Sequence, residues 1–204
     1  MKVLNLYAGL CGNRKLWQDV EVTNVELNPK IAAIGKRLHP DDKWIVGDAH
    51  QYLLEHFEEF DFIWISRPCQ SHTRMMKFTR HKKALKYPDF GLYEEIVLLK
   101  EHFKGKWVVE NVKPYYEPLI KPSKQIGRHL FWSNFPIPDI TPPVPPDNFI
   151  NLTTVSGKKV LMDWLDIHFE ENVYYEGNHC PAQILRNCVH PKIGLEIFKA
   201  IESI

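Results

Sequence analysis

Cys69 lies where an apolar run ends and a strongly basic stretch begins. The run DFIWIS (61–66) leads into RPCQSHTRMMKFTRHKK (67–83), and no Asp or Glu occurs between Phe62 and Pro88. Cysteine reacts as the thiolate, which a positive and partly exposed setting favours. The pattern predicts a nucleophilic cysteine, and a buried, inert thiol is the alternative interpretation.

The basic stretch itself indicates a polyanionic partner. Positive charge gathered in one segment attracts nucleic acid, although a solvated basic face is the alternative. The residues expected to contact nucleic acid are Gln70, Ser71, Arg74, Lys77, Arg80, Lys82 and Lys83.

Glu110 ends a second apolar run, KWVVEN (106–111). A carboxyl group and a cysteine at neighbouring strand ends can attack a heterocyclic ring. The cysteine adds to the ring as nucleophile while the carboxyl group protonates a ring nitrogen. We therefore expect Cys69 and Glu110 to form a catalytic pair.

The turn NLYAGLCGN (5–13) follows the first apolar run and carries Gly9 and Gly12. Glycines at such a turn let a cofactor approach the backbone closely. Their spacing differs from GxGxxG, which disfavours a nicotinamide cofactor. A tight strand–helix turn without a ligand is the alternative.

Two acids follow further apolar runs. Glu26 lies near the end of VTNVEL (22–27), where an acid can bind the hydroxyls of a ribose. Asp48 follows WIV (44–46), where a carboxylate can accept a hydrogen bond from an adenine amino group. Each acid alone could be a solvated strand end, but together they predict a cofactor that contains adenosine.

Six short apolar runs alternate with helical patterns along the first two thirds of the chain. Such alternation predicts βαβ units and a mostly parallel, doubly wound α/β sheet. In these sheets the functional residues lie at the carboxyl ends of the strands. The runs are 3–7, 22–27, 44–46, 61–66, 106–111 and 129–132.

Helix signals support this arrangement. Asn28 followed by Pro29 predicts a helix that ends before Pro40, and Asp89 can cap a helix that runs to Phe103. We also expect short helices at 158–165 and about 191–201.

The composition is that of an ordinary globular protein. The chain has 204 residues, a net charge of +1 and 44% hydrophobic residues, so overall charge indicates no partner. We expect no signal peptide, no membrane span and no disulfide framework, which favours a reducing, cytoplasmic compartment.

The chain divides at a proline-rich segment. Six prolines fall between 136 and 146, where neither a helix nor a central strand can form. We expect a catalytic domain at 1–135, a connector with a small additional segment at 136–180, and a closing helix region at 181–204. His179, Cys180, Cys188 and His190 match no common zinc spacing, so we predict no metal site.

These motifs together resemble those of the DNA cytosine-5 methyltransferases. RPCQS (67–71) is similar to the family's Pro-Cys-Gln nucleophile motif, and ENV (110–112) matches its Glu-Asn-Val. NLYAGLCG (5–12), VELN (25–28) and GDA (47–49) look like its cofactor motifs, IGRHLFW (126–132) like its arginine motif, and QILRNCVHP (183–191) like its closing motif. The length and the 127–138 stretch resemble the compact, phage-type members.

The resemblance implies a Rossmann-like fold and methyl transfer from S-adenosyl-L-methionine to C5 of a flipped cytosine in double-stranded DNA. Cys69 would add to C6, Glu110 would hold N3 and the amino group, and Arg128 would hold O2. The residues that would bind the cofactor are Tyr7, Ala8, Gly9, Gly12, Glu26, Leu27, Asp48, Ala49, Pro68, Asn187 and Val189.

Three features depart from the family pattern. Arg67 replaces a second proline, Ile126 replaces one of two arginines, and Arg186 replaces a glycine. The target-recognition region is also small. We expect 147–178, with Ser156, Lys158 and Lys159, to read about two to four base pairs, unless a partner supplies the reading.

Three alternatives remain open from the sequence. The same chemistry could act on tRNA, because a tRNA-methylating branch of the family shares these motifs. A non-catalytic DNA-binding relative is a second alternative, although this chain keeps both Cys69 and Glu110. A thiol redox protein is a third, but the C-x-x-C pattern is absent.

Overall fold

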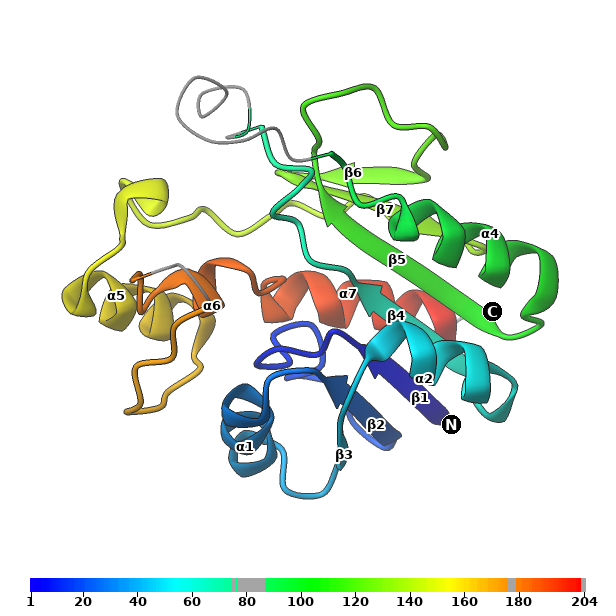
Figure 1. Cartoon of the computed structure of the whole chain (residues 1–204), viewed down its shortest axis with the longest axis horizontal. Coiled ribbons are helices and arrows are strands. Elements are labelled where there is room, and N and C mark those ends of the chain that lie inside the picture. Colours follow the sequence, from blue (N-terminus) through cyan, green and yellow to red (C-terminus); the bar gives the residue numbers. More distant parts are fainter. Residues whose placement is uncertain (75, 77–86, 176–178, 203–204) are drawn as a thin grey trace.

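The computed structural model describes residues 1–74, 76, 87–175 and 179–202. Its described strands form one sheet in the order β3-β2-β1-β4-β5-β7-β6 (Figure 1). The first five strands of this order are parallel, and β7 and β6 are antiparallel to their neighbours. The strands are β1 (Lys2–Leu6), β2 (Glu21–Glu26), β3 (Lys43–Val46), β4 (Phe62–Ser66), β5 (Lys106–Val112), β6 (Lys124–Ile126) and β7 (His129–Ser133).

Side chains of the central strands alternate between two apolar layers. Along β4, Phe62 and Trp64 point to one layer and Ile63 and Ile65 to the other. Both faces of the strand are therefore covered, as is typical of parallel sheets. This explains why the strand reads as a continuous apolar run.

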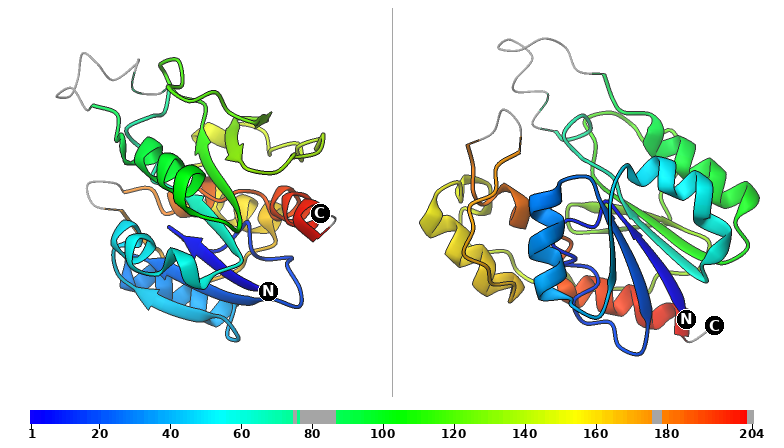
Figure 2. Two further views of the ribbon diagram at one scale, coloured as in Figure 1. Left: turned by 90° about the vertical axis from the view of Figure 1, so that its right-hand side faces the viewer. Right: turned by 60° about the horizontal axis from the view of Figure 1, so that its bottom comes forward.

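Helices cover the two faces (Figure 2). Leu53 of α2 (Ala49–His56) and Ile96 of α4 (Gly91–His102) pack in one layer, and Ile193 and Ile197 of α7 (Pro191–Glu202) pack in the other. The doubly wound α/β class expected from the sequence is confirmed.

A third apolar cluster lies beside the sheet. It joins Ile31 and Ile34 of α1 (Pro29–Leu38) to Leu161 and Leu165 of α5 (Val155–Leu165), and it includes α6 (Gln183–Arg186). The segment after the proline-rich connector thus shares its core with the first helix of the sheet domain.

The strands and helices expected from the sequence are present, although the N-cap of α4 is Phe90 and not Asp89. Asn28 caps α1, since its side chain accepts hydrogen bonds from the N–H groups of Lys30 and Ile31. The sequence analysis did not anticipate α2, β6 or the antiparallel direction of β7. Gly127, at φ +57°, provides the tight turn between β6 and β7.

No described helix combines the length and the apolar character that crossing a membrane would need.

Candidate functional site

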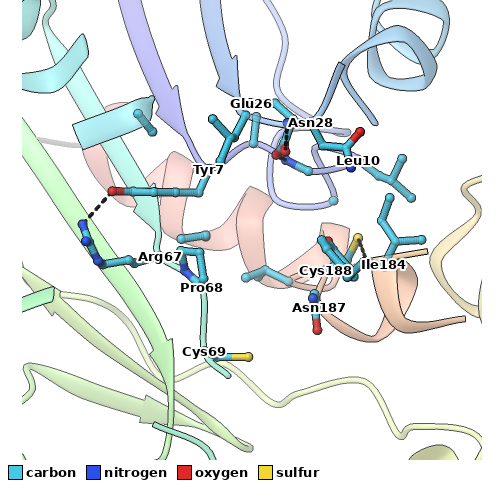
Figure 3. A pocket seen from close by; sticks show the side chains of 18 of the residues that line it. Tyr7, Leu10, Glu26, Asn28, Arg67, Pro68, Cys69, Ile184, Asn187 and Cys188 are labelled. Atoms are coloured by element: carbon cyan, nitrogen blue, oxygen red, sulfur yellow. Dashed lines mark hydrogen bonds between the residues drawn. The ribbon is translucent and has the colours of Figure 1, made fainter. Parts of the chain in front are cut away.

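A cavity of about 780 Å³ opens at the carboxyl ends of β1, β2, β4 and β5. Glu26 and Cys69 lie at opposite ends of the view in Figure 3. All three residues expected to act in catalysis, and all eleven expected to bind the cofactor, line this single cavity. The tertiary structure thus gathers residues that are spread from position 7 to position 189.

The turn after β1 has an unusual backbone. Tyr7, Gly9 and Cys11 have φ values of +55°, +55° and +56°. A Cβ added at Gly9 would meet nothing within 4 Å. The side of Gly9 that lacks a side chain therefore faces open space, where a ligand can approach the backbone.

Gly12 has a packing role that the sequence analysis did not predict. A Cβ at this position would lie 2.5 Å from the main-chain oxygen of Val189 and 2.9 Å from Cβ of Cys188. Gly12 lets the first turn pack closely against the closing motif. It therefore brings that motif to the cavity, beyond any effect on cofactor approach.

Glu26 holds the turn in place. Its carboxylate accepts hydrogen bonds from the N–H groups of Gly9 (3.0 Å) and Asn28 (2.9 Å). Burial raises the pKa of Glu26 above its ordinary value, although these N–H groups oppose the shift. A carboxylate has about four acceptor positions, so acceptor capacity remains for a hydroxyl group of a ligand.

Asp48 is the N-cap of α2, and its Oδ1 accepts from the N–H of Gln51 at 3.0 Å. The sequence analysis missed this structural use. Oδ2 is the oxygen left for a ligand in the cavity that Asp48 lines.

Cys69 follows β4, whose last residue, Ser66, pairs in register with Glu110 on β5. This register brings the loop that carries the cysteine beside the carboxyl group. Burial, followed by the charge of Glu110, raises the pKa of the Cys69 thiol to about 11, while Arg128 lowers it. The expectation of a ready thiolate is therefore wrong for the described surroundings, because burial outweighs the nearby positive charge.

Arg67, which stands where the family that the sequence resembles has a proline, anchors the loop. Its guanidinium forms ion pairs with Asp89 (2.9 Å) and with the fully buried Glu95. It also contacts the hydroxyl of Tyr7 at 2.6 Å (Figure 3), and that hydroxyl lies 2.6 Å from Glu95. Arg67 thus connects the loop before Cys69 to the turn after β1, through Tyr7, and to α4, through Glu95.

Glu110 contacts the imidazole of His129. Both residues are buried, and Nδ1 of His129 lies 2.5 Å from Oε1 of Glu110. The guanidinium Nε of Arg128 donates to Nε2 of the same imidazole at 3.1 Å. Sequence reasoning missed His129, because the hairpin that brings it to Glu110 is visible only in the structure.

Arg128 is held from several sides. It bonds the main-chain oxygen of Arg186, and its guanidinium carbon lies 4.9 Å from the centre of the Phe149 ring. The guanidinium lies close enough to Cys69 to lower the pKa of its thiol. Its predicted contact with a base oxygen stays a prediction.

The residues expected to contact nucleic acid lie in different parts of the structure. Gln70 lines the cavity, whereas Ser71 accepts a hydrogen bond from the N–H of Asp89 at 3.1 Å. Arg74 lines a second hollow of about 580 Å³, together with Tyr115 and Tyr116. Lys77, Arg80, Lys82 and Lys83 lie outside the described residues.

Lys158, which the sequence analysis placed among the base-reading residues, is buried instead. Its ammonium group donates to the main-chain oxygens of Glu170 (3.1 Å) and Glu171 (2.6 Å) and lies 4.2 Å from the centre of the Phe169 ring. These contacts leave Lys158 no access to a base edge. The expectation was wrong because the helical spacing alone did not show which face of α5 would be covered.

Tyr174 and Tyr175, from the same segment, line the cavity. Burial and the nearby Glu26 raise the pKa of Tyr175. The segment after the connector therefore contributes part of the cavity wall, which sequence reasoning did not anticipate. Among the described residues, no three His, Cys, Asp or Glu side chains gather in a way that could hold a metal ion.

Comparisons with known proteins give similarity in structure alone. No protein-family model matches the chain, and no curated protein matches it in sequence. Dnmt2 of Spodoptera frugiperda is 24% identical over 55% of this chain and 35% of its own, with a TM-score of 0.40. Dnmt2 of S. pombe is 19% identical over 55% of this chain and 36% of its own, with a TM-score of 0.41.

A TehB-like SAM-dependent methyltransferase of Corynebacterium glutamicum is 19% identical over 58% of each chain, with a TM-score of 0.38. The present chain thus spans little more than a third of the length of the two Dnmt2 proteins.

Proposed function

We propose that the protein is an S-adenosyl-L-methionine-dependent methyltransferase that acts on C5 of cytosine in double-stranded DNA. One observation carries the proposal: a cysteine and a buried glutamate lie in the same cavity as a glycine turn and two strand-end acids. The first pair suits attack on a cytosine ring, and the second group suits adenosine.

The cavity suits the cofactor in size and in chemistry. A volume of about 780 Å³ falls within the range of small-molecule sites, about 300–1,000 Å³. Glu26 has acceptor positions left for the ribose hydroxyls, and Asp48 has one oxygen for the adenine amino group. The open side of Gly9 leaves space beside the backbone.

The protein's own residues would drive the reaction in two stages. Once a cytosine is flipped into the site, the Cys69 thiol would give its proton to solvent water and Sγ would bond to C6. Glu110, protonated for this step, would give its proton to N3. Electron density then builds at C5, which receives the methyl group that bound S-adenosylmethionine supplies. Water would then take the C5 proton and N3 would return its proton to Glu110, while cleavage of the C6–S bond restores the aromatic ring and releases the Cys69 thiolate.

The raised pKa of Cys69 places a requirement on this scheme. At neutral pH the thiol is protonated in the free protein, since its pKa is about 11. A proton must therefore leave the thiol before Sγ can attack the ring. Arg128, which lowers this pKa, is the described residue that would stabilise the thiolate.

Methyl transfer from tritiated S-adenosylmethionine to plasmid DNA and to tRNA would test the proposal. We expect incorporation into DNA, recovered as 5-methylcytosine, and none with Cys69→Ser, because a hydroxyl is a far weaker nucleophile than a thiolate. Incorporation into tRNA alone would replace the DNA assignment with the tRNA alternative. Equal activity of Cys69→Ser would exclude the covalent mechanism.

A further inference from the structure

The imidazole of His129 links the guanidinium of Arg128 to the carboxyl group of Glu110. We infer that His129 is a positioning residue that fixes Glu110 for the base, held in one neutral tautomer by Arg128. The kinetic role rests on the proposed function, whereas the tautomer is a property of the free protein and can be tested alone.

The tautomer follows from the donors and acceptors. Arginine has five N–H donors and no acceptor. The Nε–H of Arg128 therefore donates to Nε2 of His129, and that nitrogen carries no proton. The proton of the neutral imidazole must then lie on Nδ1, which donates it to Oε1 of Glu110 at 2.5 Å.

The direction of this chain of hydrogen bonds decides what Glu110 can do. Oε1 accepts from Nδ1 of His129. Glu110 lines the cavity, so Oε2 is the oxygen that can face a cytosine. A carboxyl group whose Oε1 is already an acceptor can carry its proton on Oε2 and donate it to N3 of the ring.

The backbone makes the arrangement rigid. Glu110 and His129 lie on the neighbouring strands β5 and β7, where Val112 pairs with His129 in register. The N–H of Lys113 donates to the main-chain oxygen of Arg128 at 2.8 Å, which fixes the tip of the β6–β7 hairpin to the end of β5. Both side chains are at least nine-tenths buried, so neither can turn freely.

Nitrogen-15 NMR of the free protein tests the tautomer without substrate. The chain has ten histidines, and the signal that His129→Asn removes identifies this one. We expect a protonated Nδ1 and an unprotonated Nε2 at neutral pH, with a change in the Nδ1 signal in Glu110→Gln. An imidazolium, or a proton on Nε2, would overturn the inference.

Three variants separate the two hydrogen bonds in methyl-transfer assays on plasmid DNA. The amide of His129→Asn can occupy the place of Nδ1 and donate to Glu110. The amide of His129→Gln reaches the place of Nε2 and can keep only the bond to Arg128. His129→Leu keeps neither bond. We expect His129→Asn to keep most of the wild-type kcat. His129→Gln and His129→Leu should lose up to about 100-fold in kcat, with unchanged cofactor affinity by calorimetry.

The outcomes distinguish a positioning role from a structural one. If all three variants lose activity and cofactor affinity alike, His129 only supports the fold and the inference fails. If His129→Leu is as active as the wild type, it also fails. A wild-type protein that modifies no nucleic acid would refute the proposed function, while the NMR result would still decide the hydrogen-bond chain.

Discussion

The side-chain amide of Asn111 donates a hydrogen bond to the main-chain oxygen of Arg67 at 3.1 Å. The end of β5 therefore holds the loop that begins at the end of β4 and carries Cys69 two residues further on. Glu110 and Asn111 are adjacent in sequence, so a single strand end positions both the carboxyl group and the nucleophile.

Loss of this bond should reduce activity more than stability. In Asn111→Ala we expect kcat for methyl transfer to fall by up to about 100-fold, because the Cys69 loop is no longer fixed. Asn134→Ala is the matched control, since Asn134 bonds Gly105 (2.8 Å) and Trp107 (3.0 Å) at the opposite end of the strand. If both variants lose stability alike and neither loses activity, the bond has no role in positioning.

Cys69 should react slowly with iodoacetamide at neutral pH. Its pKa is raised to about 11, so the thiolate fraction and the alkylation rate should rise about tenfold per pH unit between pH 7 and 9.5. Glu110→Gln should be alkylated faster at each pH, because a nearby negative charge is removed. Peptide mapping by mass spectrometry measures the rate, and full reactivity at pH 7 would contradict the assignment of the raised pKa to burial.

Duplex DNA that carries 5-fluorocytosine should form a covalent complex with the protein. Cys69 can still add to C6 and C5 can still be methylated, but fluorine cannot leave C5 as a proton does. The complex should survive denaturing electrophoresis, and it should require both S-adenosylmethionine and Cys69. If a duplex of the same sequence with ordinary cytosine is methylated but the 5-fluorocytosine duplex forms no complex, the covalent route is wrong.

Glu26→Ala and Asp48→Ala should weaken the binding of S-adenosylmethionine by roughly 1–3 kcal/mol each. Asp48→Ala also uncaps α2, so Asp48→Ser is needed as a control. Serine preserves the cap but removes the carboxylate. Calorimetry should show reduced affinity in both Asp48 variants and reduced thermal stability in Asp48→Ala alone. Unchanged affinity in Glu26→Ala and Asp48→Ser would sink the cofactor assignment.

Lys158→Met should destabilise the fold without affecting DNA binding. Methionine cannot replace the hydrogen bonds that the Lys158 ammonium donates to the main-chain oxygens of Glu170 and Glu171. The free energy of unfolding should therefore fall by about 1.5–3 kcal/mol, the range for hydrogen bonds of charged groups. Lys159→Met, at an exposed position, should change stability little. Urea unfolding measures the difference. A reduced salt dependence of DNA binding in Lys158→Met would instead indicate a phosphate contact.

The sequence alone was enough to predict which apolar segments form the parallel strands and which residues lie at the carboxyl ends of those strands. The reason is local: continuous apolar runs indicate strands covered on both faces, and glycine, acid or cysteine at the end of each run marks the functional edge. Tyr7, Glu26, Asp48, Cys69 and Glu110 could all be placed in one site from this rule, and they do line one cavity.

Only the tertiary structure decided how these residues are supported and charged. The contact of His129 with Glu110 and the ion pairs of Arg67 depend on strand register and on helix α4, which local patterns do not encode. Likewise, burial outweighs the nearby arginine at Cys69, and the covered face of α5 makes Lys158 structural. Desolvation depends on what packs around a group in three dimensions, so it could not be predicted from the order of residues alone.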